Sequence, residues 1–248
     1  MKHLIPIATR RTLHASRRWI EDFVRGDRRH FARSTSNHPQ SDAAFPPQVT
    51  ITQPITVSPL VANKVHNLTL AAQCINTVVI NPQQVFSFWA VVGSPTRRRG
   101  YLPGQVLIRQ ILQADYGGGL CQLSGLLYQL ALTAGLPILE RHTHSVDIYT
   151  EATRYTPLGS DATVAYGYKD LRFVNTLNHP VCVEITVASD SITGRLCTEA
   201  AIAPYQLEYL AKDLEHSIEV EILRWTQDRT QSQSLGKCRY LRPEKSPT

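Results

Sequence analysis

The sequence has little of what anchors, exports or cross-links a chain. Its longest apolar runs, such as residues 130–136, are far too short to cross a bilayer. The positively charged start lacks the long apolar segment of a signal peptide. The five cysteines are odd in number and include no CxxC pair, which excludes a zinc ribbon and a thioredoxin motif. These absences predict a cytoplasmic protein with free thiols, held at most peripherally at the inner face of the membrane.

Excess positive charge is confined to the start of the chain. Residues 1–33 carry nine basic and three acidic side chains and account for the whole formal charge of +6, so the rest of the chain is balanced. We therefore expect no nucleic acid as a partner of the body. The segment 12–26 has the pattern of a basic amphipathic helix. Two interpretations stay open: residues 10–33 contact an anionic membrane surface, or the helix docks on the body with its arginines in solvent.

Periodicity along the chain indicates an α+β fold. Helical spacing predicts helices over 60–75 and 120–134, and the second of these is followed by Gly135 and Pro137, which end helices. Alternating patterns predict short sequential strands that pair antiparallel. Those strands are expected at 78–80, 105–112, 138–148, 162–168, 171–175, 181–187, 192–197 and 218–225. Three regions follow: a basic helix and linker (1–47), the main domain (48–225) and a polar tail (226–248) with one expected strand near 238–241.

A cysteine at the start of the second helix is the strongest chemical signal. Gly117, Gly118 and Gly119 precede Cys121, which places its thiol in the first helical turn. The positive end of the helix dipole and unpaired backbone N–H groups favour a thiolate there. The glycine N–H groups, together with Gln122, are candidate donors to an oxyanion or a substrate.

The lengths of the expected helix and of the strand after it predict that a histidine lies close to this thiol. The helix from Cys121 to Gly135 rises about 21 Å, and a returning strand recovers that distance in about six residues. The count from Ile138 reaches His144, with His142 one same-face step before it. A cysteine beside a histidine is the nucleophile–base arrangement of acyl transfer, which needs neither a cofactor nor a metal.

The group that orients the imidazole is less constrained by sequence. Asp161 is the preferred candidate, as in a catalytic triad, with Asp147 and Asn175 as competitors. Alternation along the expected strand points Arg141 to the face opposite the histidines, toward other carboxylates.

Two alternatives stay open beside acyl transfer. His142, His144 and Cys121 are three ligands that suit a zinc-dependent hydrolase. The second alternative is a folded domain without catalytic activity that uses the motif for binding.

An ordered series of motifs resembles the VanW family. The series comprises Asn81-Pro82, Phe86-Ser87-Phe88, Gly93, Arg99-Gly100-Tyr101, Gly117-Gly-Gly-Leu-Cys-Gln122, Glu140-Arg141, His144-Ser145, Asp161-Ala162 and Asp170-Leu-Arg-Phe-Val-Asn175. The resemblance covers about Leu60 to Ile222, and the segment 117–122 is its most specific part. The family is named after an accessory protein of glycopeptide-resistance clusters. It implies Cys121 as nucleophile and His144 as its partner, because some envelope-anchored members are thought to be L,D-type peptidoglycan transpeptidases.

The combined expectation is an antiparallel sheet packed against a central helix with Cys121 at its N-terminus, a site geometry analogous to papain-like thiol enzymes. The expected substrate is a peptide or amide, such as a peptidoglycan precursor, for an L,D-transpeptidase or amidase. The rival function is an accessory or binding protein of a cell-envelope or glycopeptide-resistance system. Peptidoglycan is cross-linked outside the cytoplasmic membrane. Two interpretations therefore stay open: the start of the chain is an unusual export or surface-anchoring segment, or the activity is cytosolic and acts on a precursor peptide or another amide.

Overall fold

The computed structural model describes residues 7–34, 45–108, 111–146 and 154–242. It has the expected α+β composition, and every ladder between its named strands is antiparallel. The helices are α1 (Ile7–Val24), α2 (Val61–Ile75), α3 (Phe88–Val92) and α4 (Leu120–Thr133), with 3-10 turns at Asp27–Arg29 and Arg97–Arg99.

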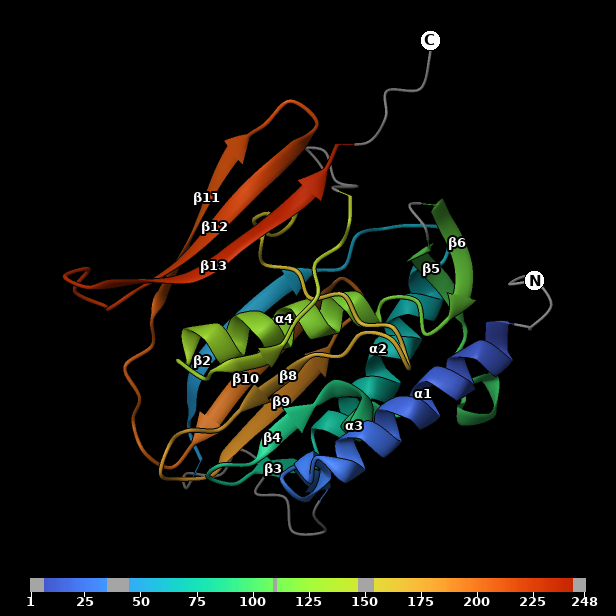
Figure 1. Cartoon of the computed structure of the whole chain (residues 1–248), viewed down its shortest axis with the longest axis horizontal. Coiled ribbons are helices and arrows are strands. Elements are labelled where there is room, and N and C mark those ends of the chain that lie inside the picture. The colour runs from blue at the N-terminus through green and yellow to red at the C-terminus, as the bar shows by residue number, and fades with distance from the viewer. Residues whose placement is uncertain (1–6, 35–44, 109–110, 147–153, 243–248) are drawn as a thin grey trace.

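Four sheets carry the strands. The five-stranded sheet has the order β1 (Arg33–Ser34), β3 (Val78–Ile80), β9 (Val181–Val187), β10 (Ser191–Thr198) and β2 (Pro47–Pro54). A second sheet contains β4 (Val85–Ser87), β8 (Arg172–Val174) and β7 (Ile138–Glu140), in that order. The third is the hairpin of β5 (Pro103–Ile108) and β6 (Ile111–Tyr116), and the fourth holds β11 (Gln206–Asp213), β12 (Ser217–Trp225) and β13 (Ser232–Leu241). This last sheet projects from one side of the molecule (Figure 1).

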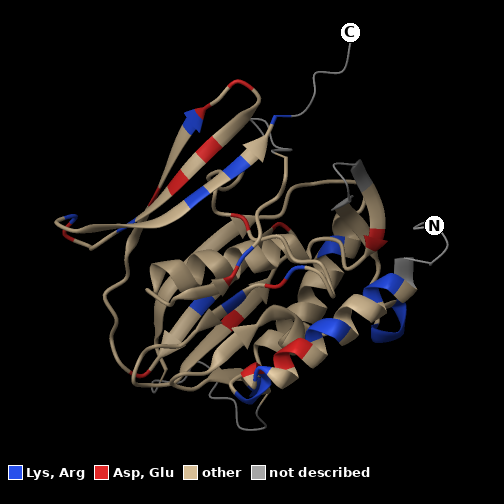
Figure 2. Cartoon of the chain, in the orientation of Figure 1, with Lys and Arg blue, Asp and Glu red and all other residues tan. Residues whose placement is uncertain are grey.

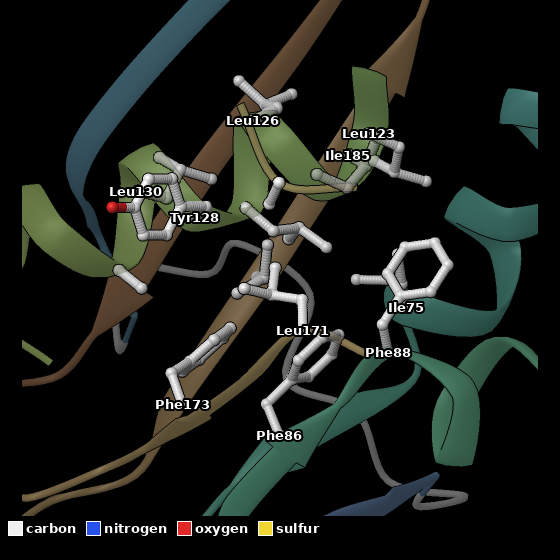
Figure 3. Close-up of a cluster of buried hydrophobic side chains, with 14 of the residues drawn as sticks. Ile75, Phe86, Phe88, Leu123, Leu126, Tyr128, Leu130, Leu171, Phe173 and Ile185 are labelled. Atoms are coloured by element: carbon white, nitrogen blue, oxygen red, sulfur yellow. The ribbon is translucent and has the colours of Figure 1, made fainter. Parts of the chain in front are cut away.

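The main core lies between α4 and the five-stranded sheet. Leu123, Leu126 and Leu130 form a buried stripe on α4, which faces the sheet near Ile185 (Figure 3). Gly194 of β10 permits this approach, because a Cβ there would lie 2.7 Å from a methyl carbon of Leu130. The core thereby fixes the position of α4 and of the residues at its start.

The end of α4 follows from its sequence, as expected. Gly135 adopts a left-handed conformation with φ of +79°, and its N–H and that of Leu136 bond to the last carbonyls of the helix. Pro137 then prevents continuation.

Three expected strands are wrong in extent. The strand expected over 105–112 is a hairpin, β5 and β6, and the one expected over 162–168 is an extended segment with a single bridge between Ala165 and Lys169. The strand expected over 138–148 ends at Glu140; residues 141–146 are irregular, and 147–148 lie outside the described residues. The strand does not continue because the backbone N–H of His144 donates to the Asp161 carboxylate, at 2.7 Å, instead of to the carbonyl of a neighbouring strand.

Other elements were not expected or are longer than expected. β2 and β11 lie in stretches for which no strand was predicted, and β13 extends the strand expected near 238–241 back to Ser232. Within the described residues no helix is long and apolar enough to span a membrane.

The basic helix α1 docks on the body through its charges. Arg11 pairs with Asp115, Arg18 pairs with Glu140, and Asp22 accepts two hydrogen bonds from Arg172, at 2.8 and 2.7 Å. The expectation of a docked helix with its arginines in solvent is therefore wrong for Arg11 and Arg18. Figure 2 shows Lys and Arg along α1 and just beyond its C-terminal end. Contact of residues 10–33 with a membrane stays a prediction.

Candidate active site

The three glycines form a tight turn that delivers Cys121 to the start of α4. Gly117 and Gly119 have φ values of +81° and +103°, which residues with a Cβ rarely adopt. Gly118 packs so closely against the β5 backbone that a Cβ would lie 2.2 Å from a backbone carbon of Gly104. Asn67 of α2 fixes the turn, because its amide donates to the Gly118 carbonyl at 3.0 Å. Cys121 is the second residue of α4 and is half-buried.

The imidazole of His144 lies within interaction range of the Cys121 thiol, whose sulfur also contacts the Val164 carbonyl at 3.7 Å. Nδ1 of that imidazole lies 2.7 Å from a carboxylate oxygen of Asp161. This bond leaves Nε2 of His144 for the sulfur. Cys121, His144 and Asp161, predicted as a nucleophile, a base and an orienting acid, therefore lie together in one cluster of interacting side chains.

The helix that carries the thiol also positions the carboxylate. The hydroxyl of Ser124, one turn after Cys121, donates to the carbonyl of Ala162. Gly125 faces the backbone of Asp161 and Ala162, where a Cβ would make only ordinary contacts of 3.6–3.7 Å. These contacts hold Asp161 beside the first turns of α4.

Asp161 receives hydrogen bonds from three other residues. His144 donates its backbone N–H in addition to the ring contact, Arg141 Nη2 lies 3.1 Å from the second carboxylate oxygen, and the Tyr240 hydroxyl donates to that same oxygen. The expectation that Arg141 points away from the histidines is therefore wrong. The strand on which that expectation depended ends at Glu140, so alternation no longer applies.

The electrostatics of the cluster of Cys121, His144 and Asp161 favour a thiolate–imidazolium pair. Burial opposes the charge on His144, but the hydrogen bonds to Asp161 and Cys121 outweigh it and raise the pKa of His144 to about 10. Burial alone would raise the pKa of Cys121, whereas its hydrogen bond to His144 and the imidazolium charge bring that pKa below its ordinary value. Burial likewise opposes ionised Asp161, yet His144 and Arg141 lower its pKa to about 2.

Most of the expected oxyanion donors already have partners. The N–H groups of Gly117, Gly118 and Gln122 donate to the carbonyls of Leu102, Asp115 and Gly119 respectively. The Gln122 side-chain amide donates to the Pro54 carbonyl at 2.9 Å. Among the described residues, the N–H groups of Gly119 and Cys121 have no hydrogen-bond acceptor. These two are the donors left for a developing oxyanion.

The secondary candidates lie in other bonding networks. His142 bonds to Glu140 at 2.9 Å, and the buried Asn175 bonds the carbonyls of Ile80 and His179. Asp147 lies outside the described residues. Nor do the described ranges gather three or more His, Cys, Asp or Glu side chains placed to hold a metal ion, so the zinc ligand set expected from Cys121, His142 and His144 is not assembled.

A cavity of about 1470 Å³ opens onto this cluster. Its lining includes Cys121, His144 and Asp161, and it extends to Trp89 and to the start of α1 at Arg11. The volume is ample for a peptide segment of several residues. Cys121 therefore lines a space large enough for such a ligand.

Sequence reasoning missed two residues of this region. Tyr240 comes from β13, and nothing in its local pattern points to a residue 79 positions earlier. Lys64 of α2 lines the cavity beside Gly119. Its position among the apolar residues Val61, Val65 and Leu68 of the helical pattern is a signal that could have found it.

An α+β domain with a cysteine, histidine and aspartate cluster in a large cavity defines the class of site. The comparisons with known proteins define the family. The chain matches the family described as VanW like protein over residues 63–197, and it belongs to this family. The match includes Lys64, Cys121, His144 and Asp161 but neither α1 nor Tyr240.

Two curated relatives share this region. The uncharacterized protein YoaR of Bacillus subtilis (strain 168) is 38% identical over 141 residues, which are 53% of this chain and 45% of YoaR. The vancomycin B-type resistance protein VanW of Enterococcus faecalis (strain ATCC 700802 / V583) is 34% identical over 134 residues, 54% of this chain and 49% of that protein. The matched part thus covers about half of each relative's length. No solved structure matches the chain.

Proposed function

We propose that this protein is a cysteine-dependent acyl transferase of the L,D-transpeptidase or amidase type that acts on peptidoglycan-related peptides. The observation that carries the proposal is the cluster in which the His144 imidazole interacts with the Cys121 thiol and bonds to the Asp161 carboxylate. Placement of a nucleophilic cysteine at a helix start, with its histidine on a neighbouring segment, is analogous to papain-like thiol enzymes. The resistance protein among the relatives supports a substrate from cell-wall metabolism.

The first half of the reaction forms a thioester. The Cys121 thiolate attacks the carbonyl carbon of a peptide bond, and the N–H groups of Gly119 and Cys121 stabilise the oxyanion. His144 gives its Nε2 proton to the leaving amine as the C–N bond breaks. Asp161 keeps the imidazole in the tautomer and orientation that this transfer requires.

The second half releases the acyl group. An amine or water attacks the thioester carbonyl while neutral His144 accepts the proton of that nucleophile. The C–S bond breaks and the Cys121 thiolate is regenerated. An amine acceptor makes the reaction a transpeptidation, and water makes it a hydrolysis.

Replacement of the nucleophile tests the proposal. With a peptidoglycan tetrapeptide as substrate, we expect Cys121→Ala to lose turnover by roughly 10³-fold or more, because no other side chain forms the thioester. Intact-mass spectrometry of the wild-type protein should show the acyl adduct on Cys121. Cys74→Ala, at a half-buried cysteine of α2, is the matched control and should keep both signals.

A different outcome would favour the rival function. Saturable peptide binding by the wild-type protein, with no adduct and no product, indicates an accessory or binding protein and overturns the acyl-transfer proposal.

A further inference from the structure

Among the described residues, the lining of the cavity around Cys121 holds more basic than acidic side chains. Its lining includes two carboxylates, Asp115 and Asp161, against six lysine and arginine residues. The six cationic residues are Arg10, Arg11, Lys64, Arg97, Arg154 and Lys169. A cavity with this balance concentrates anionic ligands.

Both carboxylates of the lining are bound by other groups. Asp115 pairs with Arg11 and accepts the N–H of Tyr116. Asp161 is bound by His144, Arg141 and Tyr240. Both carboxylates are therefore engaged by groups other than Lys64.

Lys64 lines this cavity beside the glycine turn that leads to Cys121. Its Cγ lies so close to Gly119 that a Cβ on that glycine would be 2.7 Å away. Among the described residues the Lys64 ammonium has neither a salt bridge nor a hydrogen bond. The side chain is only partly exposed, and burial lowers its pKa, since its charge has lost water without gaining a partner.

We propose that Lys64 binds a free carboxylate of the substrate, beside the carbonyl that Cys121 attacks. This inference depends on the proposed function for its substrate class, a peptide with a carboxylate next to the reacting bond. A charge-assisted hydrogen bond to a carboxylate would satisfy the ammonium and hold the peptide in register with the sulfur and with the N–H groups of Gly119 and Cys121. The carboxylate comes either from the terminal residue or from a side chain next to the reacting bond.

Two alkylating reagents of equal size test the site without any turnover. Iodoacetate carries a carboxylate and iodoacetamide a neutral amide, and both alkylate the Cys121 sulfur. We expect Lys64→Met to lower the ratio of the iodoacetate rate to the iodoacetamide rate by about tenfold. The measured quantity is the ratio, so a change in thiolate content affects both rates alike. His144 attracts iodoacetate equally in both proteins.

Lys169→Met is the matched control, because Lys169 lines the same cavity. An unchanged ratio in Lys64→Met, or an equal fall in both variants, overturns the proposal. Methionine keeps the apolar stem, so we expect Lys64→Met to be at least as stable to heat as the wild-type protein, because an unpaired cation has been removed. A failure of the alkylation test leaves the turnover test with Cys121→Ala unaffected, and the reverse also holds.

Peptide variants then identify the source of the carboxylate. If it is the terminal one, amidation of the peptide C-terminus should raise KM for the wild-type protein by about tenfold and have little effect on Lys64→Met. If it belongs to a side chain, amidation of that side chain should have this effect instead. Equal sensitivity of both proteins to both changes contradicts carboxylate binding by Lys64.

Discussion

Asp161 is the residue on which the candidate site converges, and the sequence pointed to it only in part. A carboxylate was expected behind the histidine, and His144 was reached by counting the length of a returning strand. The structure places His144 against Cys121 and Asp161, although that strand ends at Glu140. Side-chain hydrogen bonds to Asp161, from Arg141 and Tyr240 among others, replace the regular strand. Periodicity cannot reveal such bonds, because they join residues far apart in the sequence.

The hydrogen bond from Tyr240 to Asp161 can be tested by a single substitution. Removal of the Tyr240 hydroxyl takes one donor from Asp161 and loosens the orientation of that carboxylate, so the imidazole of His144 is positioned less firmly beside Cys121. We expect Tyr240→Phe to slow alkylation of Cys121 at neutral pH by about three- to tenfold and to lower the free energy of unfolding by about 1 kcal/mol. Rates with iodoacetamide and thermal denaturation measure the two effects.

Tyr209→Phe is its control. The Tyr209 hydroxyl is buried and has no hydrogen-bond partner in the described part of the chain, so its loss should leave both quantities unchanged or raise stability slightly. Equal effects of the two variants would mean that Tyr240 acts only as core packing.

At the scale of elements, α1 shows what a helical pattern can and cannot predict. Its existence follows from local periodicity, but the face that it turns to the body depends on charged partners 104 to 150 residues away in sequence. Arg11 and Arg18 face inward. The exposed side includes Leu13, Trp19, Ile20, Phe23 and Val24, which are 50–77% exposed. Trp19 and Phe23 stack on each other, and Arg28 lies over the Trp19 ring.

This exposed face sharpens the prediction of membrane contact. We expect the protein to co-sediment with vesicles rich in anionic lipid, because aromatic side chains with neighbouring arginines suit the interface of such a bilayer. The double variant Trp19→Ala and Phe23→Ala should weaken binding by at least about tenfold. The control is Leu210→Ala at an exposed apolar residue of β11. Equal binding of the variant and the wild-type protein, or no binding of either, would contradict the prediction.

At the scale of the whole molecule, local strands were easier to predict than their arrangement. β3 and β9 match their expected ranges. In the five-stranded sheet, however, β10 pairs with β2, whose residues lie 137 or more positions earlier in the sequence, as in the pair Ser191 and Pro54. The sheet β11–β13 lies beyond the family match at residue 197 and still supplies Tyr240 to the site. Such long-range pairings depend on the packing of the complete core rather than on any local pattern.

The ionisation of Cys121 tests the central claim most directly. The rate of iodoacetamide labelling at Cys121, followed by peptide mass spectrometry across pH, gives the apparent pKa of this thiol. Cys182 and Cys197 serve as internal controls, because burial raises their pKa values to about 11 and about 12. We predict that labelling of Cys121 begins well below the ordinary cysteine pKa of about 8.5 and that His144→Ala shifts the rise to higher pH. A rise at or above that ordinary value in the wild-type protein, unchanged in His144→Ala, would contradict the account.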